Sequence, residues 1–149
     1  MVTWQLRKAQ LSDLEAVKTL FDAHRRELGF VRRPSVAKSI GDDEVIVAVI
    51  GDNIIGAIHY HLRRDGQTTL YHIAVDANYR RAGVGAALLA ELRAHCLTNG
   101  AGRIMLKCPA ELPANDFYSH RGFQKAGVEE GKYRSLNVWI LQVDNSSLS

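Results

Sequence analysis

The sequence predicts a mixed α/β (α+β) fold, in which a mostly antiparallel central sheet of about seven strands is flanked by about four helices. Short runs of β-branched and aromatic residues, which suit a pleated strand, are separated by turns that contain Gly, Asp or Asn. Over residues 70–107 the order is strand, loop, helix and strand, as in a right-handed crossover between parallel strands. The 149 residues are enough for one domain, expected over residues 1–144, with a frayed tail at 145–149.

The N-terminal half is expected to form two helices and three strands. The first helix begins near Ser12 and Glu15, which have the spacing of a capping box, and ends at Gly29. Pro34 suits the first turn of a second helix, which Gly41 closes. The strands of this half are expected at residues 2–7, 44–50 and 54–62.

The C-terminal half is organised around one amphipathic helix. This helix is expected from Val84 onwards, because Val84, Leu88, Leu92 and Cys96 recur every four residues and Leu89 widens the apolar face. The other elements of this half are expected to be strands at residues 70–75, 103–107 and 134–143, a helix at 114–121, and a strand that begins after Gly122-Phe123.

The loop that enters this helix, residues 79–85, has a basic sequence with two glycines. Gly83 and Gly85 leave no side chain over the first helical turn, where unpaired N–H groups and the helix dipole favour an anion. Arg80 and Arg81 add two positive charges. The loop therefore predicts an anion site, with phosphate as the favoured anion. The alternative is that the glycines serve helix–sheet packing and that the arginines are a solvated surface.

The spacing excludes the common nucleotide-binding phosphate loops. Instead, Arg80-x-x-Gly83-x-Gly85 after a strand resembles the acyl-CoA loop of the GNAT N-acetyltransferase superfamily. Residues 114–123, about 35 residues further on, resemble the second signature of that family, in which Ala, Phe/Leu-Tyr and Gly-Phe bracket a short helix. The order of elements is similar to that of the family along nearly the whole chain, so residues 1–144 are expected to be a GNAT acetyltransferase domain.

The resemblance implies an N-acetyltransferase with acetyl-CoA as co-substrate. A primary amine of a small molecule or peptide would attack acetyl-CoA directly in a ternary complex. The family's tyrosine corresponds to Tyr118, a general acid for the CoA thiolate. The alternatives are that Tyr118 only packs in the core or only orients the thioester. An acyl-CoA-binding or regulatory module without catalysis is the alternative function.

The resemblance also implies where CoA binds. The pantetheine arm would pair with the main chain near Ile73 and Val75, in the manner of an added strand. A main-chain N–H near Ile73 or Ala74 would polarise the thioester carbonyl. The implied cofactor-binding residues are Ile73, Ala74, Val75, Arg80, Arg81, Ala82, Gly83, Val84, Gly85, Ala86, Asn115 and Tyr118.

The sequence assigns no general base by position. Thr69 and Tyr71 stand at the acceptor-facing positions and are candidate substrate residues, and Lys107 stands where some relatives have a glutamate. His72 is a candidate base, although strand alternation turns it away from Thr69 and Tyr71 unless a bulge near the loop alters that parity. We therefore expect water, or the amine's own ionisation, in place of a single histidine. The other histidines that could serve are His59 and His61.

Composition narrows the partners further. The formal net charge of +3 mildly favours anionic ligands but gives little support to nucleic-acid binding. The two cysteines do not have metal-ligand spacing, and no metal site is expected. The sequence shows neither an apolar run of membrane-spanning length nor a signal peptide, so a cytoplasmic monomer or homodimer is expected. Residues 24–33, with four arginines, fall where relatives bind the acceptor, but they name no substrate.

Overall fold

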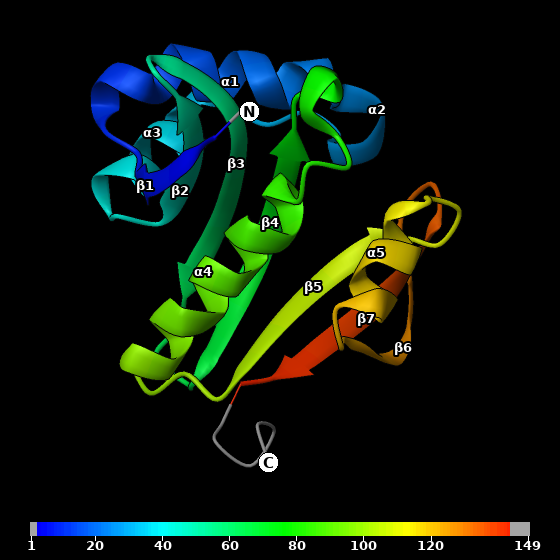
Figure 1. The fold of residues 1–149 in the computed structure, drawn as a ribbon. Coiled ribbons are helices and arrows are strands. Elements are labelled where there is room, and N and C mark those ends of the chain that lie inside the picture. The colour runs from blue at the N-terminus through cyan, green and yellow to red at the C-terminus, as the bar shows by residue number, and fades with distance from the viewer. Residues whose placement is uncertain (1–2, 144–149) are drawn as a thin grey trace. The chain divides into compact units, whose positions relative to one another are not determined.

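The computed structural model describes residues 3–143, and the expected frayed tail at 145–149 lies outside these residues. The described residues form one seven-stranded sheet of order β1-β2-β3-β4-β5-β7-β6 (Figure 1). β4 and β5 are parallel, whereas the pairs β1–β2, β2–β3, β5–β7 and β6–β7 are antiparallel. The predicted mixed, mostly antiparallel sheet is confirmed.

The elements follow the predicted order. The strands are β1 (Gln5–Lys8), β2 (Val45–Ile50), β3 (Asn53–Leu62), β4 (Gln67–Val75), β5 (Arg103–Pro109), β6 (Gln124–Glu130) and β7 (Ser135–Gln142). The α-helices are α1 (Leu14–Ala23), α2 (Arg25–Leu28), α3 (Arg33–Gly41), α4 (Val84–Thr98) and α5 (Ala114–His120), and short 3-10 helices occur at η1 (Leu11–Asp13) and η2 (Ala77–Tyr79).

The first helix differs from its prediction in two ways. It is interrupted at His24, so that the four-residue α2 follows α1 as a separate helix. The capping box of Ser12 and Glu15 is wrong, because α1 begins after Asp13, whose carboxylate accepts a hydrogen bond from the Gln10 N–H. The Glu15 carboxylate instead pairs with the Arg33 guanidinium at 2.9 Å.

Contacts divide the chain into two compact units. The first contains the residues up to His61 together with Tyr71–Leu92, and the second contains Leu62–Leu70 and the chain from Arg93 onwards. β4 and α4 each begin in one unit and end in the other. The predicted loop and the C-terminal end of β4 therefore belong to the first unit, whereas α5 belongs to the second.

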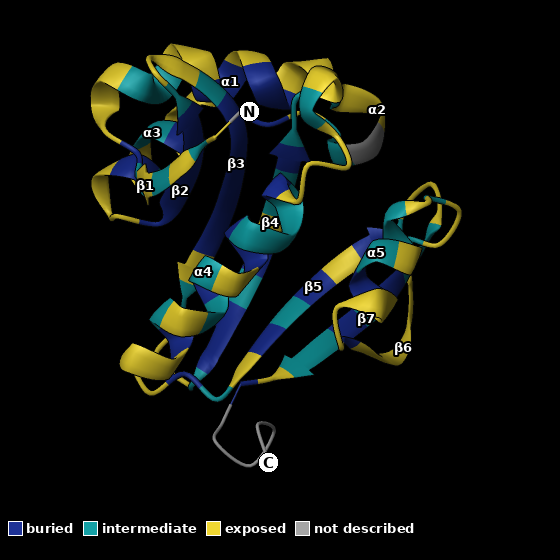
Figure 2. Ribbon diagram, in the orientation of Figure 1, coloured by how far each residue is buried: buried dark blue, intermediate teal, exposed yellow. Residues whose placement is uncertain are grey.

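In the first unit, α1 and α3 cover one face of the strands. Their core contains Val17, Phe21 and Val36 from the helices and alternate residues of β2, beginning with Val45 and Val47. Figure 2 shows β2 and the middle of β3 in the colour of buried residues, because α4 packs on the opposite face. Both faces of these strands are covered, which explains the unbroken apolar run of β2.

Gly56 in β3 allows the start of α4 to approach the sheet. A Cβ atom at this position would lie 2.9 Å from Cγ1 of Val84, 3.2 Å from Cδ1 of Leu88 and 3.4 Å from the main-chain oxygen of Ala74. A glycine inside a strand often marks such an approach. The predicted apolar face of α4 is confirmed, since Val84, Leu88, Leu92 and Cys96 are all buried.

The second unit contains helix α5 together with strands β5, β7 and β6. β5 pairs with β7 from Arg103 opposite Gln142 to Pro109 opposite Leu136. Alternate β5 residues, Ile104, Leu106 and Cys108, are buried. β6 is the edge strand and is exposed along its whole length.

None of the helices in residues 3–143 combines the length and apolar character that are needed to cross a lipid bilayer. The longest of them, α4, has 15 residues.

We expect Gly56→Ala to lower the free energy of unfolding by ~1–3 kcal/mol, the usual cost of an overpacked contact. The added methyl group would push on Val84, so CoA binding should weaken as well. Chemical denaturation measures the first effect and calorimetry the second. Gly102→Ala is the matched control, because no atom lies within 4 Å of a Cβ there. Equal stability of the two variants would contradict the assigned contact.

Candidate active site

The loop between β4 and α4 has a defined local structure. The Asp76 N–H donates to the main-chain oxygen of Ile55 at 2.8 Å, and the Asp76 carboxylate accepts from the Asn78 N–H at 2.9 Å. The loop then passes through two residues in the left-handed region, Arg81 with φ of 69° and Gly83 with φ of 85°. These two turns lead the backbone directly into α4, which begins at Val84.

The first turn of α4 is open to a ligand. Residues 80–83 are exposed, and the nearest atom to a Cβ at Gly83 would be Cη2 of Trp4, at 3.9 Å. The first helical hydrogen bond in this turn runs from the Ala87 N–H to the Gly83 oxygen at 3.0 Å. The preceding N–H groups, from Val84 to Ala86, therefore have no intrahelical acceptor. The geometry is that of an anion site.

The end of β4 offers main-chain groups as well. The parallel ladder with β5 joins Gln67–Thr69 to Arg103–Met105. Ile73 and Val75 lie beyond this ladder and are half-buried, whereas Ala74 is buried in the core of the first unit.

In the second unit, Tyr118 is held between two aromatic rings. Its side chain makes edge-on contacts with Phe117 and Phe123, at centroid distances of 5.5 and 5.6 Å, and is only 7% exposed. Burial, with a smaller effect from the nearby Cys108 thiol, raises the pKa of the Tyr118 phenol well above its usual range. The phenol is therefore a neutral O–H group that can donate a proton.

The Asn115 amide is occupied by hydrogen bonds within the second unit. Its Nδ2 donates to the main-chain oxygens of Pro109 and Leu112 at 2.9 and 2.8 Å. Its Oδ1 accepts from Asn137 Nδ2 at 3.0 Å and from Trp139 Nε1 at 2.9 Å. Sequence reasoning missed Asn137 and Trp139, although a buried Asn in the apolar strand β7 is the signal of such a partner. Asn115 fixes the turn that precedes α5.

A histidine pair lies in the first unit. His59 in β3 and His72 in β4 form a hydrogen bond between their Nδ1 atoms, which are 3.2 Å apart. Nε2 of His59 lies 2.7 Å from Oγ of Ser39 in α3. The two imidazole rings stack at 5.4 Å, and Phe21 packs against both. Three polar side chains are thus connected in a row from β4 to α3.

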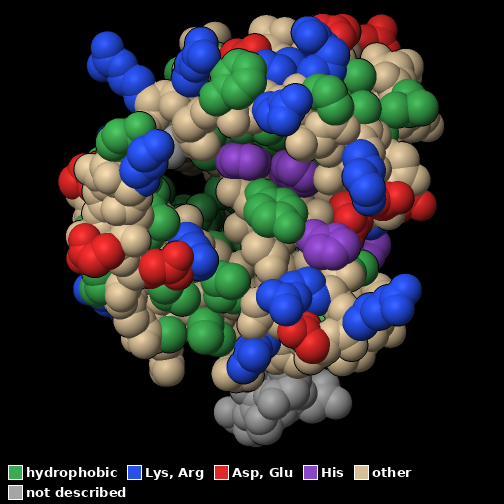
Figure 3. Space-filling model, turned by 180° about the vertical axis from the view of Figure 1, so that it is seen from behind, with side chains coloured by type: hydrophobic (Ala, Val, Ile, Leu, Met, Phe, Trp, Pro, Cys, Tyr) green, Lys and Arg blue, Asp and Glu red, His purple; other side chains and the backbone are tan. Residues whose placement is uncertain are grey.

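Tyr71 joins the same cluster. The Tyr71 ring lies 5.2 Å from His59 and 6.4 Å from His72, so two consecutive residues of β4 contact one histidine. Tyr71 is 49% exposed, and Figure 3 shows histidine side chains grouped on one face of the protein beside hydrophobic ones.

Burial keeps the histidine pair uncharged. It lowers the pKa of both His59 and His72 from 6.5 to about 4, and for His59 the neighbouring His72 contributes to this shift. At pH 7 only about a thousandth of such a group is protonated. Each neutral ring has one N–H donor and one bare nitrogen acceptor.

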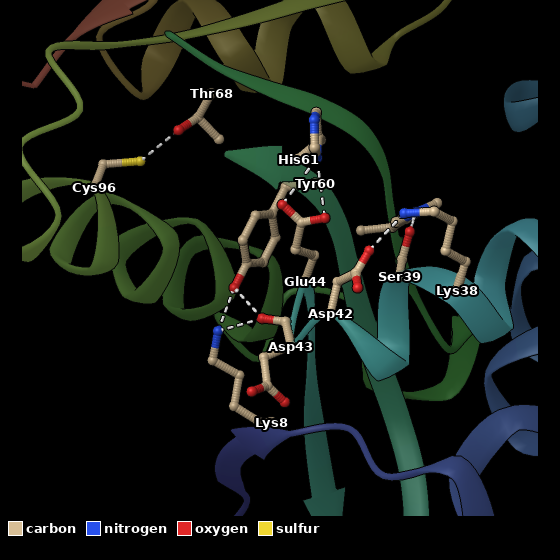
Figure 4. A network of polar contacts seen from close by, with 11 residues as sticks. Lys8, Lys38, Ser39, Asp42, Asp43, Glu44, Tyr60, His61, Thr68 and Cys96 are labelled. Carbon is tan, nitrogen blue, oxygen red and sulfur yellow. Dashed lines mark hydrogen bonds and ion pairs between the residues drawn. The ribbon is translucent and has the colours of Figure 1, made fainter. Parts of the chain in front are cut away.

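A second polar network in the first unit is satisfied internally. The Lys8 ammonium donates to the Tyr60 hydroxyl at 2.5 Å and to the main-chain oxygen of Asp43 at 2.6 Å (Figure 4). The Glu44 carboxylate lies 3.0 Å from Nδ1 of His61. We infer that these contacts stabilise the positions of β1 and β3. Within residues 3–143, no group of three or more His, Cys, Asp or Glu side chains could hold a metal ion.

Two of the four arginines in the basic segment at residues 24–33 make contacts within the protein. The Arg25 guanidinium lies over the Phe30 ring at 5.1 Å, and the Arg33 guanidinium is paired with Glu15. Phe30 itself is 65% exposed, so this segment presents an aromatic ring together with positive charge to solvent.

The predicted site residues are divided between the two units. The first unit contains the predicted loop, the end of β4, Tyr71 and His72, and the second contains Thr69, Asn115 and Tyr118. Within the first unit, the loop follows directly on β4, the strand that carries His72.

Comparison with known families identifies the class of protein. The sequence profile of the Acetyltransferase (GNAT) family matches residues 9–123, which is most of the chain. The chain therefore belongs to this family. A comparison with the curated proteins finds no significant match.

Solved structures share this fold. Ard1 from Thermoplasma volcanium is 18% identical with a TM-score of 0.87, over 97% of this chain and 100% of that one. The ribosomal-protein-S18-alanine N-acetyltransferase from Escherichia coli is 20% identical with a TM-score of 0.81, over 95% of each chain. The PaiA N-acetyltransferase from Thermoplasma acidophilum, solved with coenzyme A, is 15% identical with a TM-score of 0.78, over 94% of this chain and 99% of that one.

The histidine pair should make stability depend on pH. Because the pKa of His59 and His72 is about 4 in the folded chain and near 6.5 when unfolded, the unfolded chain binds more protons between these values. The stabilisation is complete above pH 6.5 and is lost as the pH falls toward 4. We expect the free energy of unfolding to fall by about 2 kcal/mol for each histidine, or on the order of 4 kcal/mol for the pair, between pH 7 and pH 5. Urea denaturation of wild type and His59→Gln tests this, and equal pH slopes would contradict it.

Proposed function

We propose that this protein is an acetyl-CoA-dependent N-acetyltransferase that acts on a primary amine of a small molecule or peptide. The observation that supports this most directly is the open first turn of α4 behind Arg80 and Arg81, in a chain that belongs to the GNAT family. Neither arginine is ion-paired with any of residues 3–143, so both charges are available to a pyrophosphate.

The loop would bind the pyrophosphate, and the end of β4 the pantetheine arm. The N–H groups from Arg81 to Ala86 would donate to phosphate oxygens, a charge-assisted contact that the helix dipole strengthens. The main chain at Ile73 and Val75, beyond the β4–β5 ladder, would pair with the amides of the arm. Asn115, whose amide is fully hydrogen-bonded, would position α5 and not touch the cofactor itself.

The chemistry would be direct acyl transfer. The amine nitrogen attacks the thioester carbonyl, and the N–H of Ile73 or Ala74 stabilises the negative charge that develops on its oxygen. The attacking nitrogen loses a proton, the C–S bond breaks, and the Tyr118 phenol gives its proton to the departing thiolate and takes one back from solvent before the next turnover. Burial keeps the phenol protonated at neutral pH, so its O–H group is present to donate to the thiolate.

A second candidate function is a non-catalytic acyl-CoA-binding or regulatory module. It is favoured by the absence of a carboxylate base at Thr69, Tyr71 and Lys107, the last of which is ion-paired with Glu129 at 2.9 Å. Thiol release from acetyl-CoA with a panel of primary amines distinguishes the two functions. A module of this kind would bind CoA but release no thiol with any amine. For either function, we retain the proposal of a cytoplasmic monomer or homodimer.

We expect Gly83→Glu to weaken CoA binding by on the order of 2–4 kcal/mol, because a carboxylate would enter the anion site. Gly83→Gln is the matched control, since it has the same size and the same strain at a φ of 85°. We expect Gly83→Gln to lose at most half as much CoA-binding free energy as Gly83→Glu. Calorimetry measures both affinities, and circular dichroism checks the fold. Equal losses in the two variants would show that the negative charge is not the cause of the weaker binding. Near-normal binding by Gly83→Glu would show that the loop does not bind the pyrophosphate.

We expect Tyr118→Phe to lower kcat by ~10²-fold or more while leaving the KM for acetyl-CoA almost unchanged. Phenylalanine keeps the ring contacts with Phe117 and Phe123, so the loss would report the hydroxyl and not the packing. Tyr133→Phe, at an 88% exposed tyrosine, serves as the control. A normal kcat for Tyr118→Phe would assign the proton to another donor.

A further inference from the structure

We propose that His72, His59 and Ser39 form a proton relay that takes a proton from the acceptor amine to solvent. This inference rests on the proposed acetyltransferase function. It assigns a role to two residues, His59 and Ser39, that lie outside both signature motifs. The relay replaces a single general base by a row of hydrogen bonds across β4, β3 and α3.

The row begins at a nitrogen that a substrate can reach. The only side-chain hydrogen bond of His72 within residues 3–143 is made by its Nδ1. No buried side-chain nitrogen or oxygen in that range lacks a partner. Nε2 of His72, which has none, is therefore not fully enclosed by the protein. His72 also directly precedes Ile73, whose N–H is a proposed donor to the thioester oxygen, so an amine that attacks there would be close to this strand.

The two rings are coupled through one proton. An Nδ1–Nδ1 hydrogen bond needs one ring as donor and the other as acceptor, so the tautomer of one ring determines the tautomer of the other. When His72 donates, its Nε2 is a bare acceptor and His59 presents Nε2–H to the Ser39 oxygen. When His59 donates, His72 presents Nε2–H and the Ser39 hydroxyl donates to His59. The geometry allows both states without movement of a ring.

Transfer converts the first state into the second. The N–H proton of the attacking amine moves to Nε2 of His72, and the Nδ1 proton of His72 moves to His59. The Nε2 proton of His59 moves to the Ser39 oxygen, which releases its own proton to water. The row resets when His72 loses its Nε2 proton to water, the Nδ1 proton returns from His59 to His72, and Ser39 returns a proton to Nε2 of His59 and takes one up from water. In one turnover a single proton passes from the amine to solvent, and no ring holds a positive charge between steps.

Burial favours a relay over a single base. A histidine that acted alone would have to hold the proton as an imidazolium, which the apolar surroundings of Phe21 and the stacked partner ring disfavour. In the relay, each ring gives up one proton as it accepts another. The far end of the row suits proton release, since Ser39 is only partly buried and its neighbour Lys38 is exposed.

Steady-state kinetics of single and double variants test the relay. We expect His59→Gln and Ser39→Ala each to lower kcat by ~10-fold or more, with the KM for acetyl-CoA unchanged. Ser39→Thr, which keeps a hydroxyl, should restore most of the rate. The double variant His59→Gln/His72→Gln should be no slower than His72→Gln, because both changes break the same row. His61→Gln is the matched control, since this half-exposed histidine on β3 pairs with Glu44.

The outcomes separate the relay from the function on which it rests. An active wild type with normal rates for His59→Gln and Ser39→Ala, or with losses that multiply in the double variant, overturns the relay and leaves the acetyltransferase intact. A wild type that binds CoA but acetylates no amine overturns both. If His59→Gln does not fold, the comparison of Ser39→Ala with Ser39→Thr decides, and equal rates for these two exclude the relay.

Discussion

The close approach of α4 to the sheet at Gly56 is the constraint on which the candidate site depends. Without a side chain there, Val84 and Leu88 can pack on β3, and the Ala74 oxygen of β4 lies at the same point. The first turn of α4 and the end of β4 are thus held by one contact. Since the anion donors are main-chain groups of that turn, their positions follow from packing and not from any side chain of the loop.

Burial sets the protonation of the groups available for chemistry. Tyr118 is held neutral by its aromatic neighbours, and His59 and His72 are held neutral by the core around Phe21. In each case the charged form is disfavoured, so each group can pass on a proton but is poorly suited to store a charge. This is compatible with a reaction in which the amine loses a proton and the thiolate gains one, without a charged side chain between the steps.

The parts that the sequence predicts well are those set by local patterns. The period of Val84, Leu88, Leu92 and Cys96 identifies the buried face of α4, because a helix repeats every 3.6 residues whatever it packs against. The histidine contact could not be predicted, since it joins two strands and depends on the register in which β3 and β4 pair. The bonds of Asn115 to β7 likewise depend on tertiary pairing.

The division into two units assigns the two proton transfers to different parts of the chain. The histidine row, which would take the proton from the amine, lies wholly in the first unit, and Tyr118, which would protonate the thiolate, lies in the second. The ring contacts of Tyr118, with Phe117 and Phe123, lie within the second unit, and the hydrogen bonds of the histidine row lie within the first. Each group can then be tuned by its own packing, which is why substitutions at His59 and at Tyr118 should act on separate steps of one reaction.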